Sequence, residues 1–166
     1  LLVLQFVVGL HKVLPIAFRS EPESRSRELA RLIEQAPELR NATILGDPDY
    51  LVESLPYYLP NRTYLVREQK FGNVVRFTRD ARLRIYLQDI LDEARRVRSM
   101  TKQPVVILLH ERLDPSAPVR AVNEGYNWQL WTSPGQVRTF LSETRRIARF
   151  EPVCCNDESY DVYVLD

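Results

Sequence analysis

Two aspartates and one histidine are the side chains whose type and placement best suit chemistry. Asp47 and Asp49 stand one residue apart, on either side of Pro48. Some nucleotide-sugar transferases use two hard carboxylates at this spacing to hold a divalent cation on a diphosphate. The same residues also suit a structural role, because Asp47 can cap a helix that begins at Pro48, and Asp49 then gains from the helix dipole. We favour the structural role and keep Asp47 and Asp49 as candidate ligand-binding residues.

His110 is the third candidate, and its position is the best argument for a site. It follows residues 105–109, Val-Val-Ile-Leu-Leu, an apolar run typical of a strand covered on both faces. In open parallel sheets, ligands bind beyond the carboxyl ends of the strands. His11 lies in an apolar segment, so the two histidines cannot form a recognisable zinc site. The alternative for His110 is a half-exposed ring bonded to the backbone. We therefore predict no metal site, no cofactor and no catalytic residue.

Other residues that can carry chemistry have ordinary explanations. Cys154 and Cys155 have neither metal nor redox spacing, and neighbours in a strand face opposite ways, so we expect two buried or half-buried thiols. Asn41 and Asn61 begin Asn-x-Thr triplets, which matter only in a eukaryotic secretory setting. Several aromatic side chains either stack on sugar rings or fill the core, and we favour the core. They are Tyr57, Tyr58, Tyr126, Trp128 and Trp131.

Composition defines the class of protein. The 166 residues are 45% hydrophobic and 27% charged, which fits one globular domain and excludes disordered, collagen-like and disulfide-stapled chains. Lysine occurs at three positions, so arginine supplies 20 of the 23 basic residues. This bias either favours bidentate pairing with carboxylate or phosphate, or reflects genome composition. Because 22 acidic residues are interspersed and the net charge is +1, we predict no nucleic-acid binding.

The chain begins with an apolar leader, residues 1–18, followed by a polar linker at 19–26 and one domain at 27–166. The leader is too short for a complete bilayer span and lacks a signal-peptide pattern. It is either the outer end of a transmembrane helix or a helix packed on the domain. We favour the first, because both faces of residues 1–10 are apolar. Basic residues at this exit suit lipid headgroups: Arg19, Arg25 and Arg27.

Periodicity then predicts alternating helices and strands. We expect a helix capped by Ser24 or Ser26, and longer helices at 81–100, with Leu83 in its buried stripe, and from Ser133 through Ile147. Strands are expected at 42–45, 63–67, 74–78, 104–110 and 126–131, a loop at 111–125, and an antiparallel pair at 150–155 and 160–165. The predicted fold is a Rossmann-like α/β domain in one layered unit. It has a mostly parallel sheet, helices on both faces and an antiparallel C-terminal edge, and an apolar N-terminal helix precedes it.

Four short strings carry a resemblance to a known family. They are the apolar residues 1–10 with a single Gln, Ser-Arg-Glu-Leu-Ala at 26–30 after a polar exit, Gly-Asp-Pro-Asp-Tyr at 46–50, and Tyr-Asp-Val-Tyr-Val-Leu at 160–165. In this layout the chain resembles the C-terminal extracytoplasmic domain of bacterial multi-spanning glycosyltransferases of the GT-C type. Those enzymes are similar to dolichyl-phosphate-mannose–protein mannosyltransferases and take sugar from a polyprenyl-phosphate carrier. The likeness covers residues 1–110 best and leaves 111–150 unplaced.

The resemblance implies an accessory role. In that family the catalytic carboxylates lie in an early external loop between transmembrane helices, and no position of this chain matches that motif. The domain is then inert alone, with membrane lipid or the polyprenyl-phosphate carrier as partner through a parent protein. It is placed at the cell inner membrane, on the periplasmic side. Two alternatives stay open: a non-catalytic α/β binding or interaction module, and a soluble enzyme with a site near Asp47 and His110.

Overall fold

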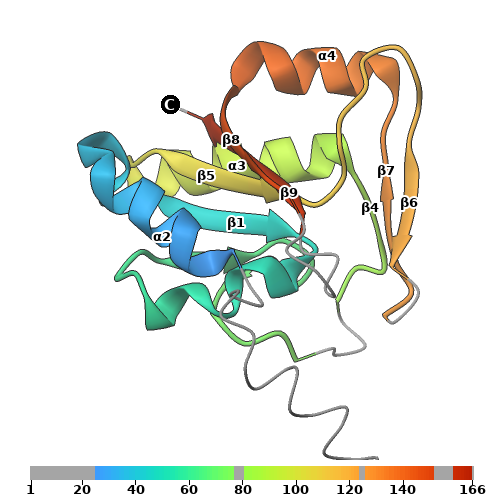
Figure 1. Ribbon diagram of the computed structural model, residues 1–166. Coiled ribbons are helices and arrows are strands. Elements are labelled where there is room, and N and C mark those ends of the chain that lie inside the picture. Colours follow the sequence, from blue (N-terminus) through green and yellow to red (C-terminus); the bar gives the residue numbers. More distant parts are fainter. Residues whose placement is uncertain (1–24, 77–80, 124–125, 152–158, 166) are drawn as a thin grey trace, which may run out of the picture.

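A computed structural model describes residues 25–76, 81–123, 126–151 and 159–165. Within these residues the chain forms a six-stranded sheet, in the order β3-β2-β1-β5-β9-β8, and a three-stranded sheet, β4-β7-β6 (Figure 1). The elements in chain order are α2 (Ser26–Gln35), η1 (Pro37–Leu39), β1 (Thr43–Asp47), η2 (Asp49–Val52), η3 (Leu55–Tyr57), β2 (Thr63–Leu65), β3 (Lys70–Phe71), β4 (Arg84–Tyr86), α3 (Leu87–Thr101), β5 (Val105–Leu109), β6 (Arg120–Asn123), β7 (Trp128–Trp131), α4 (Pro134–Glu143), β8 (Arg145–Phe150) and β9 (Tyr160–Leu165).

The larger sheet is mixed, so the prediction of a mostly parallel sheet is wrong in this respect. β1 lies between β2 and β5 and is parallel to both. β3 pairs antiparallel with β2, β9 with β5, and β8 with β9. The antiparallel C-terminal edge is confirmed, and it reaches further into the sheet than expected. The reason is that β9 returns directly beside β5, where a purely parallel sheet would need another helical crossover.

Helices cover both faces of the larger sheet, as predicted. On one face, Leu29 and Ile33 of α2 pack with Ile44 of β1. On the other, α3 and α4 pack with the sheet through side chains such as Ile90 and Phe140. All five residues of β5 are buried, which fits a strand covered on both sides. The predicted α/β architecture with a central apolar strand is therefore confirmed.

Of the smaller sheet, β7 was predicted, as part of the strand expected at 126–131, whereas β4 and β6 were not. We expected a helix from residue 81, but α3 begins at Leu87, where the carboxylate of Asp89 accepts the backbone N–H of Tyr86 at 2.7 Å. Residues 84–86 instead form β4, and Leu83 is 52% exposed. β6 lies inside the expected loop at 111–125 and pairs with β7. The helical spacing of Leu83 with the α3 stripe is thus a coincidence of periodicity.

Two other boundaries differ from expectation. Arg25, not Ser26, is the N-cap of α2, and the Ser26 hydroxyl lies 2.6 Å from that of Ser54. The helix that Ser133 caps ends at Glu143, so the residues through 147 belong to β8. This cap is confirmed, because Ser133 Oγ accepts the N–H of Gln136. Residues 74–76 form no strand, because their backbone pairs with no described strand.

Several expectations fall on residues that the structure leaves undescribed. These are the apolar leader, Ser24 as a cap, residues 77–78 of an expected strand, both cysteines, and the turn at 156–158. Across the described ranges, no helix is long and apolar enough to cross a bilayer.

Candidate functional site

The candidate residues meet at one edge of the larger sheet. Because β1, β2 and β5 run parallel, their carboxyl ends lie together, and the register places Asp47 beside Leu109. This carboxyl edge, as we call it, carries Asp47 at the end of β1, Arg67 shortly after β2 and His110 directly after β5. The sequence located Asp47 and His110 but gave no reason to select Arg67.

Asp47 forms a buried ion pair with Arg67. Nε of Arg67 donates to Oδ1 of Asp47 at 2.9 Å, and Nη2 lies 2.7 Å from the same oxygen. The two side chains are only 1% and 3% exposed. Burial raises the pKa of the Asp47 carboxyl above its ordinary value, and the guanidinium of Arg67 opposes that rise. Since arginine keeps its charge in proteins, Asp47 is the group that neutralises a buried cation.

Arg67 also joins the two sheets. Its Nη1 donates to the carbonyl oxygens of Arg82 and Leu83, at 2.9 and 2.8 Å, and its Nη2 donates to that of Gln129 at 3.4 Å. The guanidinium carbon lies 4.9 Å from the centre of the Trp128 ring. A single side chain therefore links β1 to the segment before β4 and to β7. The available sequence signal was an arginine that directly follows the apolar run at 64–66.

The predicted capping role of Asp47 is wrong. Pro48 occupies the N-cap of η2, no side chain bonds the cap, and the Asp47 carboxylate turns to Arg67 instead. Asp49 begins η2, where its Oδ1 accepts the backbone N–H of Val66 at 2.8 Å and its Oδ2 accepts that of Arg67 at 3.1 Å. The helix-capping rule fails for these two aspartates because the partner of each carboxylate is distant in sequence.

The Asp49 carboxyl is fully buried, and its pKa is raised to about 7. Burial is the main cause and the charge of Asp47 the second, while the two backbone N–H bonds act in the opposite direction. A cation at this pair of aspartates must compete with a guanidinium and with backbone donors. Within the described ranges, no cluster of three or more His, Cys, Asp or Glu side chains is arranged to hold a metal.

His110 is half-buried and bonded to the backbone, which is the alternative that the sequence left open. Its Nδ1 lies 2.8 Å from the carbonyl oxygen of Ser159, and its backbone N–H donates to the carbonyl of Asp47 at 3.1 Å. The structure therefore brings Asp47, Asp49 and His110 to one edge. It also anchors all three of them within the fold.

The described part of the chain begins at this same carboxyl edge. Arg25, the residue before α2, donates from Nε to the carbonyl oxygen of Glu151 at 3.2 Å. Glu151 directly follows β8, whose last residue, Phe150, pairs with Tyr160. Since β8 runs in the same direction as β5, its end lies on the side of His110. Arg25 therefore lies on the same edge of the sheet as Asp47 and His110.

A third buried carboxylate, Asp161, lies at this edge, and the sequence analysis missed it. Asp161 in β9 is fully buried, with its Oδ2 3.1 Å from Nη1 of Arg149 and its Oδ1 3.7 Å from Nη1 of Arg146. Burial, followed by the charge of Asp161, raises the pKa of the neighbouring Tyr163 to about 12. The sequence signal was a single acid in an otherwise apolar strand.

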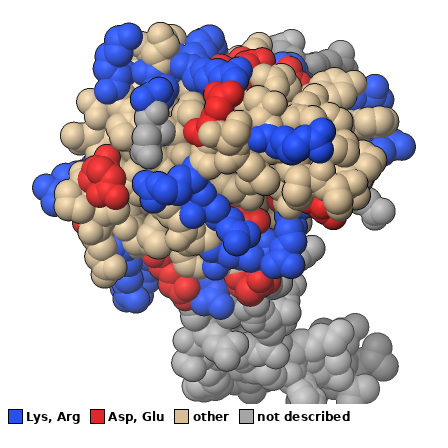
Figure 2. Space-filling view, turned by 90° about the horizontal axis from the view of Figure 1, so that it is seen from above, with Lys and Arg blue, Asp and Glu red and all other residues tan. Residues whose placement is uncertain are grey.

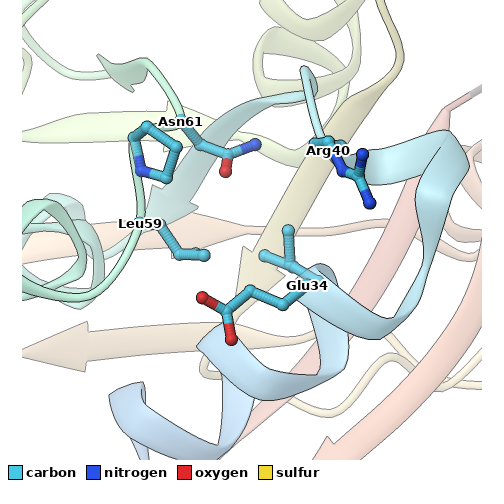
Figure 3. A pocket seen from close by; sticks show the side chains of 6 residues that line it. Glu34, Arg40, Leu59 and Asn61 are labelled. Atoms are coloured by element: carbon cyan, nitrogen blue, oxygen red, sulfur yellow. The ribbon is translucent and has the colours of Figure 1, made fainter.

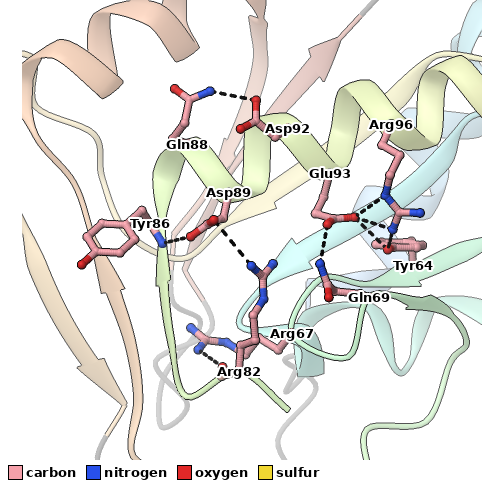
Figure 4. A network of polar contacts seen from close by, with 10 residues as sticks. All are labelled: Tyr64, Arg67, Gln69, Arg82, Tyr86, Gln88, Asp89, Asp92, Glu93 and Arg96. Carbon is pink, nitrogen blue, oxygen red and sulfur yellow. Dashed lines mark hydrogen bonds and ion pairs between the residues drawn. The ribbon is translucent and has the colours of Figure 1, made fainter. Parts of the chain in front are cut away.

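A polar network joins α3 to β2 and lies near Arg67 (Figure 4). Glu93 accepts hydrogen bonds from the Tyr64 hydroxyl at 2.8 Å and from Nε2 of Gln69 at 2.7 Å, and it pairs with Arg96. Arg96 also donates to the Tyr64 hydroxyl. These contacts fasten α3 to β2 and to the turn that follows it, so we assign the network to the fold.

The opposite edge of the sheet carries a small pocket of about 280 Å³ (Figure 3). It lies between the end of α2 and the segment before β2, with Ile33 and Leu59 as apolar lining and Glu34 and Arg40 at its rim. Asn61, one of the predicted Asn-x-Thr residues, is held there, because its Nδ2 donates to two backbone carbonyls at 3.1 and 2.8 Å.

The five aromatic candidates do not form one cluster. Tyr57 is 86% exposed in η3, and Tyr58 follows it. Tyr126 and Trp128 lie 5.4 Å apart between ring centres, with Trp128 buried, so core filling is confirmed for that tryptophan. Trp131 points to another surface, on the smaller sheet.

Comparisons with known proteins identify no relative of this chain. No family model matches it, and neither does any curated protein or solved structure. The case for a function therefore comes from the geometry.

Proposed function

We propose that this chain is a non-catalytic extracytoplasmic domain of an integral-membrane glycosyltransferase that uses a polyprenyl-phosphate-linked sugar. Residues 1–18 hold the domain at the outer surface of the membrane, and the carboxyl edge faces the lipid. The observation that carries the proposal is the bond from Arg25 to Glu151, because it places the first described residue of the chain at the carboxyl edge.

The use of the two aspartates supports the non-catalytic part of the proposal. Asp47 neutralises Arg67, and Asp49 accepts two backbone N–H groups. Both carboxylates have structural partners within the fold, so neither is open to a metal ion. A divalent cation with a nucleotide-sugar should accordingly produce no rise in melting temperature, since only a bound ligand stabilises the folded state. A clear rise at millimolar ligand favours the soluble enzyme instead.

The leader is tested by placing charges in it. We expect the full chain to float with phospholipid vesicles, and Leu4→Asp with Val8→Asp to abolish flotation without lowering the melting temperature. Arg31→Asp on the exposed side of α2 serves as the charge-matched control and leaves flotation intact. If the aspartates instead lower the melting temperature, the leader packs on the domain and the tether is refuted, because buried charge destabilises a core.

The orientation is tested by photo-crosslinking from two exposed positions. A photoreactive amino acid replaces Arg112, which lies 3.9 Å from Glu151 at the carboxyl edge, or Lys102, which ends α3 at the opposite edge. In vesicles, we expect lipid adducts from position 112 and none from position 102. Equal adducts, or adducts from 102 alone, contradict the orientation.

The parent enzyme is tested on the transcript that encodes the chain. We expect several apolar spans upstream of Leu1, with an acidic external loop after the first of them. A start codon directly before Leu1 refutes the glycosyltransferase assignment.

A further inference from the structure

The smaller sheet has an outer side that no described helix covers (Figure 1). Side chains alternate along its strands, so Ile85, Leu130 and Ala121 face the core beneath α3 and their neighbours face outward. The outward residues form what we call the outer face: Arg84, Tyr86, Arg120, Val122, Gln129 and Trp131.

Two arginines on this face are held by one tryptophan. β7 is the central strand, and Trp131 receives a guanidinium from each neighbouring strand. The guanidinium carbon of Arg84 lies 5.0 Å from the centre of the Trp131 ring, and the guanidinium carbon of Arg120 lies 4.8 Å from it. Nε1 of Trp131 donates to Oε1 of Gln129 at 3.2 Å, which fixes the plane of the ring. Both cations are therefore positioned before any ligand arrives.

Neither arginine has a carboxylate partner within the described ranges. The nearby acid Asp89 is occupied by the N–H of Tyr86 and by Arg82. A guanidinium that stacks on a ring keeps its N–H groups free at its edge, where they match a carboxylate in bidentate fashion. Within the described residues, the outer face thus presents two guanidinium groups that have no carboxylate partner and lie within about 10 Å of each other.

Apolar surface lies beside the two charges. Tyr86 is 43% exposed, 6.5 Å from Trp131 between ring centres, and Val122 is 44% exposed. A flat ring with a polar tip offers a stacking surface that stays hydrated at its rim. Cations beside such a ring suit a ligand that carries carboxylates on ring-shaped units.

We propose that the outer face binds a carboxylated sugar chain, with Arg84 and Arg120 pairing with carboxylates and Tyr86 lying against a sugar ring. Charge complementarity selects this occupant. Nucleic acid needs a run of cations along its phosphates. Figure 2 instead shows basic side chains spread among acidic and neutral ones over the side seen from above. A peptide that carries only acidic side chains would pair with the same arginines but leave Tyr86 and Val122 uncovered. The proposal does not depend on the membrane tether.

The test is a titration of the full chain with a galacturonic-acid hexamer, followed by calorimetry. We expect saturable binding at low salt that weakens severalfold between about 50 and about 500 mM NaCl, because the arginines are exposed and screened. Maltohexaose, a neutral chain, is expected not to bind. Absence of binding to the acidic hexamer at low salt overturns the proposal.

The variants assign the binding to the outer face. Arg84→Gln with Arg120→Gln should weaken binding by about tenfold or more, since both charge-assisted pairs are lost. Tyr86→Ala should weaken it while leaving its salt dependence unchanged. The matched control is Arg98→Gln, an exposed arginine on α3, which should change binding by less than about twofold. An equal loss in the control and in the double variant shows unspecific charge attraction and refutes the site.

Two further ligands test whether nucleic acid or an acidic peptide occupies the outer face instead. A single-stranded DNA dodecamer and hexaglutamate are titrated under the same conditions. Tighter binding of either one than of the acidic hexamer contradicts the proposal. The variants should change the melting temperature only slightly, because the substituted side chains are exposed or half-exposed.

Discussion

Arginine serves opposite purposes in two regions of this molecule. Arg67 is buried, pairs with Asp47 and bonds three backbone carbonyls, so all of its donors are used within the fold. Arg84 and Arg120 are exposed and lie against a neutral ring, and neither has a carboxylate partner among the described residues. The difference lies in the partner: a carboxylate consumes the hydrogen-bonding capacity of the guanidinium, whereas an indole only positions it.

Removal of Arg67 should have the largest effect. Arg67→Met leaves the Asp47 carboxylate buried without its cation, which costs about 3–5 kcal/mol of unfolding free energy. Urea unfolding measures this loss. If the methionine variant does not fold, Arg67→Lys is measured instead. It keeps the charge, and its unfolding free energy should fall by less, because only the hydrogen bonds to the carbonyls are lost. Asp47→Asn in the Arg67→Met background should recover part of the stability. A loss below about 1 kcal/mol contradicts the role of this pair.

The second-largest effect should be the contribution of Asp49 to the pH dependence of the unfolding free energy. The folded pKa of Asp49 is about 7 and its ordinary value is 3.8, so between these values the folded chain binds more protons than the unfolded chain. Its contribution is favourable at low pH and is lost as the pH rises from about 4 to about 7, with a slope of at most about 1.4 kcal/mol per pH unit.

Asp49→Asn isolates this contribution. We expect the variant to lose most of the decline between pH 5 and pH 7 when urea unfolding is repeated at each pH, whatever its absolute stability. An unchanged slope shows that another group is responsible.

The smallest effect is expected on the outer face. Arg84→Gln and Arg120→Gln each remove an exposed cation–π contact, which contributes about 0.5–1 kcal/mol or less. Thermal unfolding should therefore change little, while binding of the acidic hexamer falls. A loss as large as that at Arg67 means that the stacked arginines also maintain the fold, and the contrast between the two regions then fails.

The spacing of apolar residues predicted those helices and strands whose burial depends on residues close together in the sequence. The stripe of α3 from Leu87 to Val97 and the strand β5 are buried as expected, because their burial follows from spacing alone. Two strands of the smaller sheet escaped prediction: β4, with three residues, continues the helical spacing of α3, and β6, with four residues, lies in a segment expected to be a loop. Leu83 then fitted the helical spacing without belonging to the helix.

The positions of Asp47 and His110 could be predicted, but the partner of Asp47 could not, for a related reason. Asp47 and His110 follow apolar strands, so their edge was predictable. The role of Asp47 was not, because capping rules consider only adjacent residues, and its partner Arg67 lies 20 positions further on. Only the parallel pairing of β1 with β2 brings the two together. The stacking of Arg84 and Arg120 on Trp131 equally requires the strand order of the smaller sheet.

The amide of Asn61 has a practical consequence for production of the protein in a eukaryotic secretory host. Both of its hydrogens are donated to backbone carbonyls, of Leu39 and Ala42, so an oligosaccharyltransferase cannot use this nitrogen once the domain has folded. Asn41, by contrast, is exposed in a turn. The fraction of chains glycosylated at Asn61 therefore reports how long the polypeptide stays unfolded after translocation, with Asn41 as the internal reference.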